Sequence, residues 1–312
     1  MAETVDNSQT IEAFTRAFGP IGAHFEYEEF LSMFNNPNNR NLENSTVMMA
    51  LRKLLLDSST SFAIQLKPET LLYRGRLLDE RKLNDPKTSY SVEMIHGKKH
   101  FYGLDEYDSK EPPIGISPAQ RNNVRGASYL YLTEDKYTAC AEIRPAISSL
   151  ISLATFKTLK PLRLFDFASD QPITISMPTG NKLVDLPKLI SKIMYQFSVP
   201  VLDDKDYYPS QYIADYVRKH GFDGIRYRSM NSQGFCITLF NCSDDRVKFC
   251  SSEIVLARAP KYAIYCLNDN SAIPVPDEFD GFYNMPQETI EYMKNEVYTH
   301  IGRKRKNGSH EI

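Results

Sequence analysis

Residues 121–142 read RNNVRGASYLYLTEDKYTACAE, a polar loop that leads into a strand-like segment and then into a helix-like one. Residues 128–132 alternate in character and are rich in tyrosine and leucine, which is typical of a β-strand. Residues 133–136 are polar and suit the start of a short helix. This stretch therefore predicts a loop, a strand and a helix in direct succession, with Glu142 near the end of the helix.

The same kind of strand pattern recurs through the middle of the chain. The predicted strands share β-branched, aromatic and leucine side chains and lie at residues 71–74, 128–132, 147–156, 161–167, 222–227 and 235–240. Between them, Pro209 begins a predicted helix that Gly221 ends. Strands and helices mix without a regular βαβ alternation, so the sequence favours an α+β fold with mixed or antiparallel sheets and flanking helices.

The pattern divides the chain into three expected parts. Residues 1–66 form a predicted helical N-terminal extension, because apolar residues repeat at helical spacing along residues 48–55 after a Ser45/Thr46 cap candidate. Residues 67–262 form the predicted main body. Residues 263–312 form a C-terminal extension with a basic tail.

Length and composition exclude several classes of protein. The chain has 312 residues, of which 42% are apolar and 24% charged, so it can bury enough surface to fold and is neither disordered nor fibrous. Its 37 Lys and Arg against 39 Asp and Glu give a net charge of -2, which creates no general attraction to nucleic acid or to an anionic membrane. The basic run at residues 303–306 is interpreted as a solvated end of the chain rather than as a nucleic-acid contact or a nuclear address.

No apolar window is long enough to cross a bilayer, and residues 1–10 lack the features of a signal peptide, so we expect a soluble cytoplasmic protein. The five cysteines form no CxxC pair, which favours reduced thiols over disulfides or a zinc site. His96 and His100 lie four residues apart, but Gly97 and two lysines between them favour a surface loop over a metal site. The sequence therefore predicts no bound metal.

Arg74 is the first of three polar residues that interrupt or end apolar segments. It follows Leu71-Leu72-Tyr73 in a predicted strand, where a buried guanidinium needs an anion or several acceptors. The alternative is an arginine on an edge strand that simply reaches solvent. For Arg74 taken alone, this alternative is the better interpretation.

Glu142 is the second of these residues. It lies at the closing turn of its predicted helix, where the helix dipole disfavours a negative charge. We expect three side chains of this helix to face the core: Tyr137, Cys140 and Ala141. Either solvent or a nearby cation must compensate the charge of Glu142. The cation could belong to a functional site, and a structural ion pair with Arg144 or Arg74 is an equally good interpretation.

Ser229 is the third, and it ends the strand that begins at residue 222. Its hydroxyl could hold a phosphate or a ribose hydroxyl, or it could close the turn through its own backbone, as loop serines usually do. A triad of Ser229, His220 and Asp223 is conceivable, but nothing in the sequence fixes its order or geometry, so we discount it.

Taken in order, six segments of the chain resemble the RES domain, a family named for its arginine, glutamate and serine. The segments are residues 72–74, 121–132, 138–145, 210–214, 222–229 and 237–240. The resemblance covers residues 68–260 and rests on the order of the pieces, because no single piece is specific. The family usually has glycine before its second arginine and a proline pair soon after it, whereas this chain has Gln120 and Val124-Arg125.

The resemblance implies a fold similar to that of ADP-ribosylating toxins and a role for each of five residues. They are Arg74, Arg121, Tyr131, Glu142 and Ser229. Arg74 and Arg121 would clamp a pyrophosphate bidentately, although the altered loop leaves Arg125 as an alternative to Arg121. Tyr131 would stack on nicotinamide or ribose, Ser229 would donate to a phosphate or ribose oxygen, and Glu142 would stabilise positive charge on the sugar.

Members of the RES family are toxins of toxin–antitoxin pairs that split the nicotinamide–ribosyl bond of NAD. The resemblance therefore implies a toxin or defence enzyme with NAD as its substrate, water or phosphate as the acceptor, and an antitoxin as a candidate partner. Cleavage would pass through positive charge on the ribose, as in glycoside hydrolysis. Two alternatives stay open: ADP-ribosylation of a macromolecule in the same pocket, and a non-catalytic module that binds partners through residues 1–66 and the basic tail.

Overall fold

The computed structural model of the protein describes most of the chain between residues 25 and 257 and a few short pieces beyond. The described residues are 25–35, 41–56, 62–82, 88–169, 177–179, 182–184, 189, 193, 196–197, 204–257, 264–265 and 272–273. Most of the expected C-terminal extension, including the basic run at residues 303–306, lies outside them.

The chain divides into two compact units, each built from three separate segments. The first unit comprises Met1–Arg74, Lys110–Glu142 and Thr155–Cys250, and the second comprises Gly75–Ser109, Ile143–Ala154 and Ser251–Ile312. The division follows packing rather than the order of the sequence. The expected domain boundaries at residues 66 and 262 stay a prediction.

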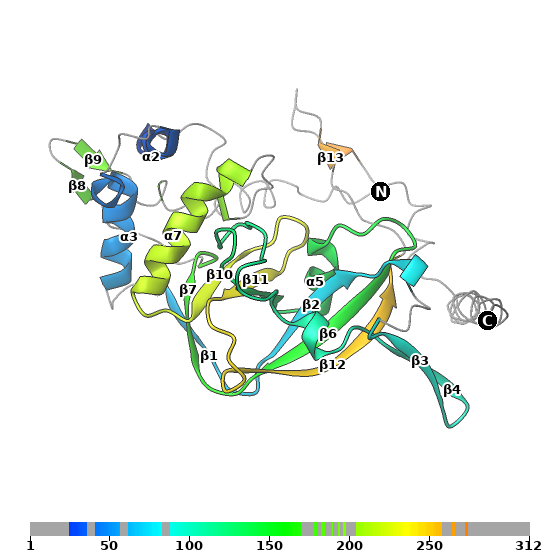
Figure 1. The fold of residues 1–312 in the computed structure, drawn as a ribbon. Coiled ribbons are helices and arrows are strands. Elements are labelled where there is room, and N and C mark those ends of the chain that lie inside the picture. The colour runs from blue at the N-terminus through cyan, green and yellow to red at the C-terminus, as the bar shows by residue number, and fades with distance from the viewer. Residues whose placement is uncertain are drawn as a thin grey trace, which may run out of the picture. The chain divides into compact units, whose positions relative to one another are not determined.

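The first unit is built on a mixed sheet (Figure 1). Its strands follow the order β1-β7-β10-β11-β5-β2-β6-β12. They are β1 Ala63–Leu66, β2 Leu71–Leu77, β5 Leu130–Thr133, β6 Leu150–Thr158, β7 Leu162–Asp166, β10 Gly224–Arg228, β11 Phe235–Leu239 and β12 Val247–Leu256. Strand β10 runs parallel to β7, whereas β11 is antiparallel to both β10 and β5. This mixed sheet with flanking helices confirms the predicted α+β class.

The second unit contains the continuation of β2, β6 and β12 and a hairpin of β3 Ser91–Ile95 with β4 Lys98–Tyr102. His96 and Gly97 form the hairpin turn with φ values of 49° and 74°, the positive values that a two-residue hairpin turn favours. His100 lies on β4. His96 therefore lies in the turn and His100 on a strand, so the two histidines do not share one face of a helix.

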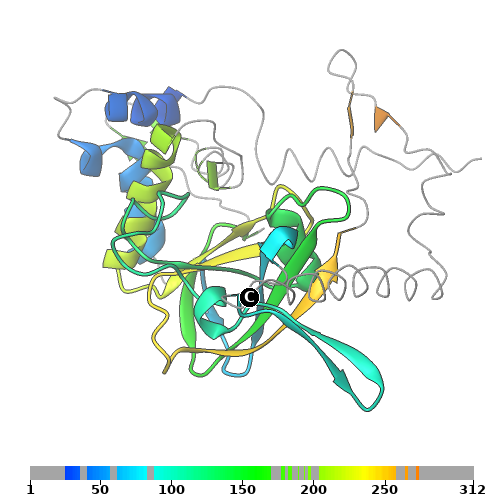
Figure 2. The same ribbon diagram turned by 45° about the vertical axis from the view of Figure 1, so that its right-hand side comes forward.

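The three long helices of the first unit lie close together in both ribbon views (Figures 1 and 2). They are α2 Phe25–Asn35, α3 Thr46–Leu56 and α7 Tyr208–Lys219. The Oγ atom of Ser45 accepts a hydrogen bond from the Met48 amide at 3.3 Å, which confirms the predicted cap of α3. Helix α7 has Pro209 in its first turn and ends before Gly221, whose φ is 80°, as predicted.

Shorter elements complete the described chain. They are α4 Glu106–Ser109, α5 Lys136–Glu142, η1 Leu42–Asn44, η2 Glu80–Lys82, η3 Asp204–Tyr207, β8 Met177–Thr179, β9 Lys182–Val184, β13 Ile264–Tyr265 and β14 Ala272–Ile273. Helix α5 follows β5 directly, in the order predicted from residues 121–142.

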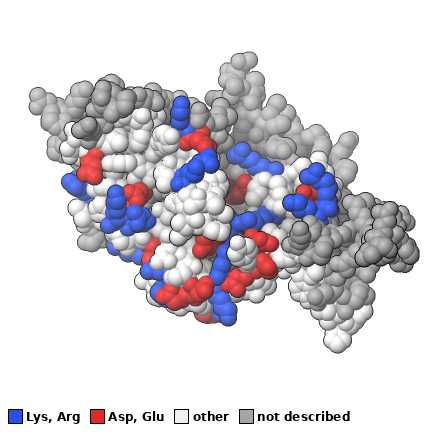
Figure 3. All heavy atoms as spheres, in the orientation of Figure 1, with Lys and Arg blue, Asp and Glu red and all other residues white. Residues whose placement is uncertain are grey.

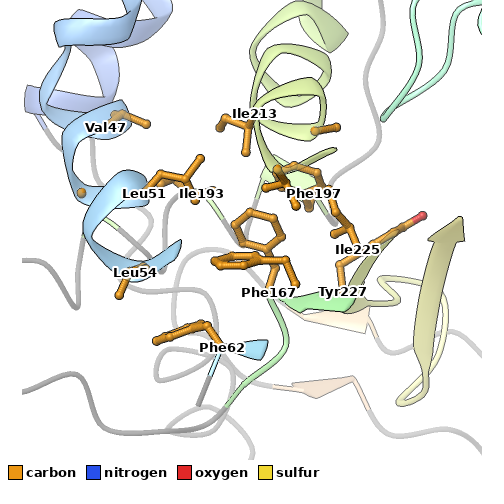
Figure 4. Packing of buried hydrophobic residues seen from close by; sticks show 14 of the residues in the cluster. Val47, Leu51, Leu54, Phe62, Phe167, Ile193, Phe197, Ile213, Ile225 and Tyr227 are labelled. Carbon is orange, nitrogen blue, oxygen red and sulfur yellow. The ribbon is translucent and has the colours of Figure 1, made fainter. Parts of the chain in front are cut away.

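The three long helices contribute buried side chains to one apolar cluster, which also contains residues of the sheet of the first unit. Figure 4 shows Leu51 of α3 and Ile213 of α7 within the same cluster as Phe167, Ile225 and Tyr227. Leu51, Ile213 and Ile225 have no exposed surface. Because α2 and α3 supply part of this core, the helical N-terminal region is packed into the first unit.

Two local expectations were wrong. Residues 63–66 were expected to be helical, but they form β1, because pairing with β7 outweighs local preference. Tyr137 was expected to face the core, but its side chain is 64% exposed, and the buried side chains of α5 are Thr138 and Ala139. A helix of only two turns has one narrow buried face, and the sequence alone does not fix its direction.

Acidic and basic side chains are intermingled over the described part of the face in Figure 3. This distribution agrees with the small net charge of -2 and shows no single-sign stripe on that face. None of the helices in the described ranges is long and apolar enough to span a membrane.

We predict that Leu51→Ala lowers the free energy of unfolding by about 2–5 kcal/mol, because it leaves a cavity in the core shared by α3 and the sheet. Leu56→Ala is the matched control, since Leu56 lies on the same helix and is 71% exposed, and it should change stability by less than about 0.5 kcal/mol. Urea denaturation followed by circular dichroism measures both, because the chain has no tryptophan. Equal stabilities of the two variants would contradict the packing of α3 into the core.

Candidate functional site

Residues 120–123 form a tight turn that presents Arg121. The Gln120 amide donates to the Asn123 carbonyl at 3.0 Å, and the Asn123 amide donates to the Gln120 carbonyl at 3.3 Å. Arg121 and Asn122 are the two residues between these tied ends. The turn therefore fixes the direction in which the Arg121 side chain leaves the backbone.

The Tyr131 hydroxyl joins this turn to β5. It accepts a hydrogen bond from the Asn122 amide at 3.0 Å and donates to Oδ1 of Asn123 at 2.7 Å. Burial raises the pKa of Tyr131, so the hydroxyl keeps its proton at neutral pH and remains a donor. Asn123 is itself buried, and its Nδ2 donates to the Ala127 carbonyl at 2.9 Å. Tyr131 thus holds the main chain beside Arg121.

Two side chains at the start of α7 also bind the turn at residues 120–123. Ser210 Oγ donates to the Arg121 carbonyl at 2.6 Å. Gln211 Nε2 donates to the carbonyls of Gln120 and Asn123 at 2.7 and 2.9 Å. Ser210 and Gln211 are both buried, so these bonds are shielded from water.

The Arg121 guanidinium lies beside Tyr227 of β10. Its Nη1 donates to the Gln196 carbonyl at 3.1 Å, and its Cζ lies 5.9 Å from the centre of the Tyr227 ring. Arg125, the alternative to Arg121, is 75% exposed and pairs with Asp204 at 3.6 Å. The two arginines therefore have different surroundings, and only Arg121 contacts the buried face of the sheet among the contacts described.

Glu142 ends α5, and two side chains hold one of its oxygens. Oε1 accepts from Ser229 Oγ at 2.5 Å and from Asn231 Nδ2 at 3.1 Å. At the other end of the helix, Asp135 caps α5 by accepting from the Thr138 amide at 2.7 Å. In these contacts, the negative charge at the closing turn is thus stabilised by hydrogen bonds from neutral donors.

The loop of residues 229–234 runs along α5. The Ser229 amide donates to the Gly234 carbonyl at 3.0 Å, and Ser229 Oγ also accepts from the Asn231 amide at 3.0 Å. Ser232 Oγ lies 2.8 Å from Thr138 Oγ1 at the start of the helix. Ser229 therefore closes its own turn, which is one of the two interpretations of this serine, and it also donates to Glu142, which neither interpretation includes.

The charges of Arg121 and Glu142 both act on Tyr227 and Cys236. Tyr227 and Cys236 are opposite each other in the β10–β11 pair, so their side chains share one face of the sheet. Burial raises the pKa of both groups, the charge of Glu142 raises it further, and the charge of Arg121 opposes the increase. Figure 4 shows the Tyr227 hydroxyl directed away from Phe167. Both charged residues therefore act on this one buried pair.

Strand register places the other predicted residues. Thr238 lies opposite Tyr131 in the β11–β5 pair, so Tyr131 shares its face with Thr238 and with Cys236 two residues before it. The structure thus brings Arg121, Tyr131, Glu142 and Ser229 around one face.

Arg74 is placed differently. Tyr73 lies opposite Thr133 on β5 and so shares the face of Tyr131, and Arg74, the next residue of β2, points to the opposite face by alternation. Arg74 Nη1 donates to the Lys110 carbonyl at 2.9 Å. The register therefore separates Arg74 from the other four predicted site residues.

The discounted triad is not assembled. His220 Nδ1 lies 2.8 Å from the Tyr216 carbonyl, and Asp223 Oδ2 accepts from the Arg163 amide at 2.8 Å. The Ser229 hydroxyl donates to Glu142.

Sequence reasoning did not assign a role to several residues of this site. They are Ser210, Gln211, Tyr227, Asn231 and Cys236. A usable signal existed for Gln211, because it is a polar residue on the apolar side of a periodic helix, and for Asn231, because it lies in the turn that starts at Ser229.

Comparison with known proteins gives one family match. Residues 97–257, more than half of the chain, match the model of the RES domain. Among solved structures, the M. tuberculosis MbcT–MbcA toxin–antitoxin complex is similar at 9% identity with a TM-score of 0.33, and the match covers 68% of this chain and 94% of that chain. A search of curated proteins finds no match. On the strength of the family model, the chain belongs to the RES domain family.

Proposed function

We propose that this protein cleaves NAD at the bond between nicotinamide and ribose, with water or phosphate as the acceptor. Membership of the RES family supports the substrate. The observation that carries the proposal is the Glu142 carboxylate, which two side chains orient beside a buried face that also receives Arg121. An oriented carboxylate and an oriented guanidinium suit a substrate that has a developing cation and a pyrophosphate.

In the proposed reaction, the bond between the ribose C1′ and the pyridinium nitrogen breaks. Its electron pair goes to the nitrogen, so nicotinamide leaves as a neutral molecule and positive charge develops on the ribose. The Glu142 carboxylate stabilises that charge. An oxygen of water or phosphate then bonds to C1′, and with water the released proton passes to solvent. The products are nicotinamide and ADP-ribose or its phosphate ester.

Ser229 and Asn231 have a positioning role in this proposal. Their donors converge on Oε1 of Glu142, which fixes the plane of the carboxylate before substrate binds. Because a hydroxyl has one proton, Ser229 cannot donate to Glu142 and to a phosphate at the same time. We therefore assign Ser229 to Glu142 rather than to the substrate.

Arg121 is the proposed phosphate ligand. It leaves a tight turn in a fixed direction, whereas Arg125 pairs with Asp204 at the surface. Arg74 is not part of this proposal, because strand alternation directs it to the other face of β2. Tyr131 contributes by holding the turn through its hydroxyl.

The biological role proposed with this chemistry is that of a toxin or defence enzyme. Loss of NAD would stop the growth of the cell that contains the active protein. An antitoxin that binds the chain would then be needed to keep that cell alive. Family membership supports this role, and growth arrest on expression, relieved by a cognate partner, would test it.

We predict that the purified protein converts NAD to free nicotinamide, and that Glu142→Gln lowers turnover about 100-fold, equivalent to about 3 kcal/mol of lost charge stabilisation. The amide keeps the size of the side chain but not its charge. The matched control is Glu43→Gln, which changes an exposed glutamate of the same unit and should leave turnover unchanged. Chromatography of nicotinamide and ADP-ribose with and without phosphate gives the rate and the acceptor.

Three results separate the alternatives in that assay. A phosphate ester that forms only when phosphate is present identifies phosphorolysis, and ADP-ribose alone identifies hydrolysis. Label retained on a macromolecule would identify ADP-ribosylation instead. Full turnover in Glu142→Gln would remove Glu142 from the mechanism, and no release of nicotinamide under any condition would overturn the proposed function.

We also predict that Arg121→Lys raises KM for NAD by about tenfold to 100-fold, because lysine lacks the planar fork that holds phosphate oxygens with two hydrogen bonds. Arg125→Lys is the matched control and should change KM by less than about twofold, because Arg125 is exposed and its ion pair contributes little. Steady-state kinetics of both variants measure the difference. The opposite ranking of the two variants would identify Arg125 as the phosphate ligand.

A further inference from the structure

The geometry points to Ser210 and Gln211 as positioning residues that set the direction of Arg121 for substrate binding. This inference rests on the proposed function, in which Arg121 binds the pyrophosphate. Both residues lie in the first turn of α7. Both hydrogen bonds of Gln211 Nε2 go to the turn at residues 120–123. Ser210 Oγ lies 2.6 Å from the Arg121 carbonyl of that turn and 3.0 Å from the Tyr207 carbonyl, and the shorter contact is the one to Arg121.

Gln211 carries a polar amide at a buried position, where an apolar side chain would be expected. Its residue surface is only 4% exposed, on a helix whose other buried positions include Ile213, Ala214 and Val217. A buried amide is unfavourable unless its hydrogen bonds are made. Both donor bonds of Gln211 Nε2 are made, and both go to the turn that carries Arg121.

The two acceptors of Gln211 are the two ends of that turn. Gln120 and Asn123 pair with each other through their main chains, and the single amide group of Gln211 bridges their carbonyls. Ser210 Oγ holds the carbonyl of Arg121 itself. The first turn of α7 thus holds three successive parts of the turn: its start, its tip and its end.

Through this arrangement, the packing of α7 in the core fixes the position of the turn that carries Arg121. Helix α7 packs into the apolar cluster through Ile213, Ala214 and Val217, so its first turn is a rigid platform. The turn is short and polar, and without these bonds its carbonyls would lose their described partners on α7 while remaining partly buried. A guanidinium displaced by about 1 Å loses the bidentate geometry on which phosphate recognition depends.

The inference predicts which kinetic constant changes. Glu142 is held by Ser229 and Asn231, and the described bonds of Ser210 and Gln211 do not involve these residues. We therefore expect Gln211→Met, which keeps the length of the side chain but removes both donors, to raise KM for NAD about tenfold to 100-fold while kcat changes by less than about threefold. Ser210→Ala should have the same pattern with a smaller rise.

The test uses a double-mutant cycle in the full-length protein. KM and kcat are measured for wild type, Gln211→Met, Arg121→Lys and the double variant, with Gln65→Met as a control, because Gln65 is exposed on β1. If Gln211 acts through Arg121, the rise in KM caused by Gln211→Met is largely lost in the Arg121→Lys background. Equal effects in both backgrounds, or a fall in kcat without a rise in KM, would overturn the inference.

Hydrogen exchange supplies a readout that does not depend on NAD turnover. Gln211→Met and Ser210→Ala should accelerate exchange of the Asn122 and Asn123 amides, while Gln65→Met should not. Unchanged exchange in both site variants would overturn the inference even if NAD cleavage is confirmed. If the variants accelerate exchange but the wild-type protein does not cleave NAD, the proposed function is contradicted. The role of Ser210 and Gln211 in holding the turn at residues 120–123 is then still supported. If Gln211→Met does not fold, Ser210→Ala carries both measurements.

Discussion

The register of β10 against β11 determines which side chains of this protein can meet. It sets Tyr227 opposite Cys236 and Ile225 opposite Thr238, and alternation then directs Ser229 to the same face as Tyr227. Gly224 helps to fix this register, because a Cβ atom at this position would lie 2.3 Å from the Thr238 carbonyl oxygen. A slip by one residue would move Ser229 to the opposite face and away from Glu142.

Once the register is fixed, the core and the site support each other. The helix α7 covers the face that carries Ile225 and Tyr227, and the same helix delivers Gln211 to the Arg121 turn. The site residues therefore come from segments far apart in sequence but are attached to one packed unit. Burial of the apolar face of α7 therefore both packs this helix and orients the site residues that it holds.

Local structure was largely predictable from sequence, whereas partners across the sheet were not. The start and end of α7 follow from Pro209 and Gly221, and β5 and α5 follow from the pattern of residues 121–142. The face to which Arg74 points depends on which strand lies next to β2 and in what register, and the sequence pattern gives no information about either.

The candidate site was predictable to a similar degree. Glu142 stands out in sequence because a helix end disfavours its charge. Among the described residues, the groups that hold Glu142 are the neutral side chains of Ser229 and Asn231 rather than an arginine, and their approach depends on a loop whose path local preferences do not fix. The role of Gln211 could not be predicted for a related reason. Its acceptors, the carbonyls of Gln120 and Asn123, lie some 90 residues away in sequence.

The use of neutral partners has a chemical consequence. In the contacts described, the Arg121 guanidinium donates to a carbonyl oxygen, and the Glu142 carboxylate accepts from a hydroxyl and an amide. Dipoles hold each charge in place without cancelling it, so each retains its field for a substrate of the opposite charge. Burial raises the pKa of Tyr227 and Cys236, and both groups stay neutral at neutral pH. In the proposed reaction, a cationic ribose and an anionic pyrophosphate would be stabilised at separate points of one buried face, which a direct ion pair between Arg121 and Glu142 would prevent.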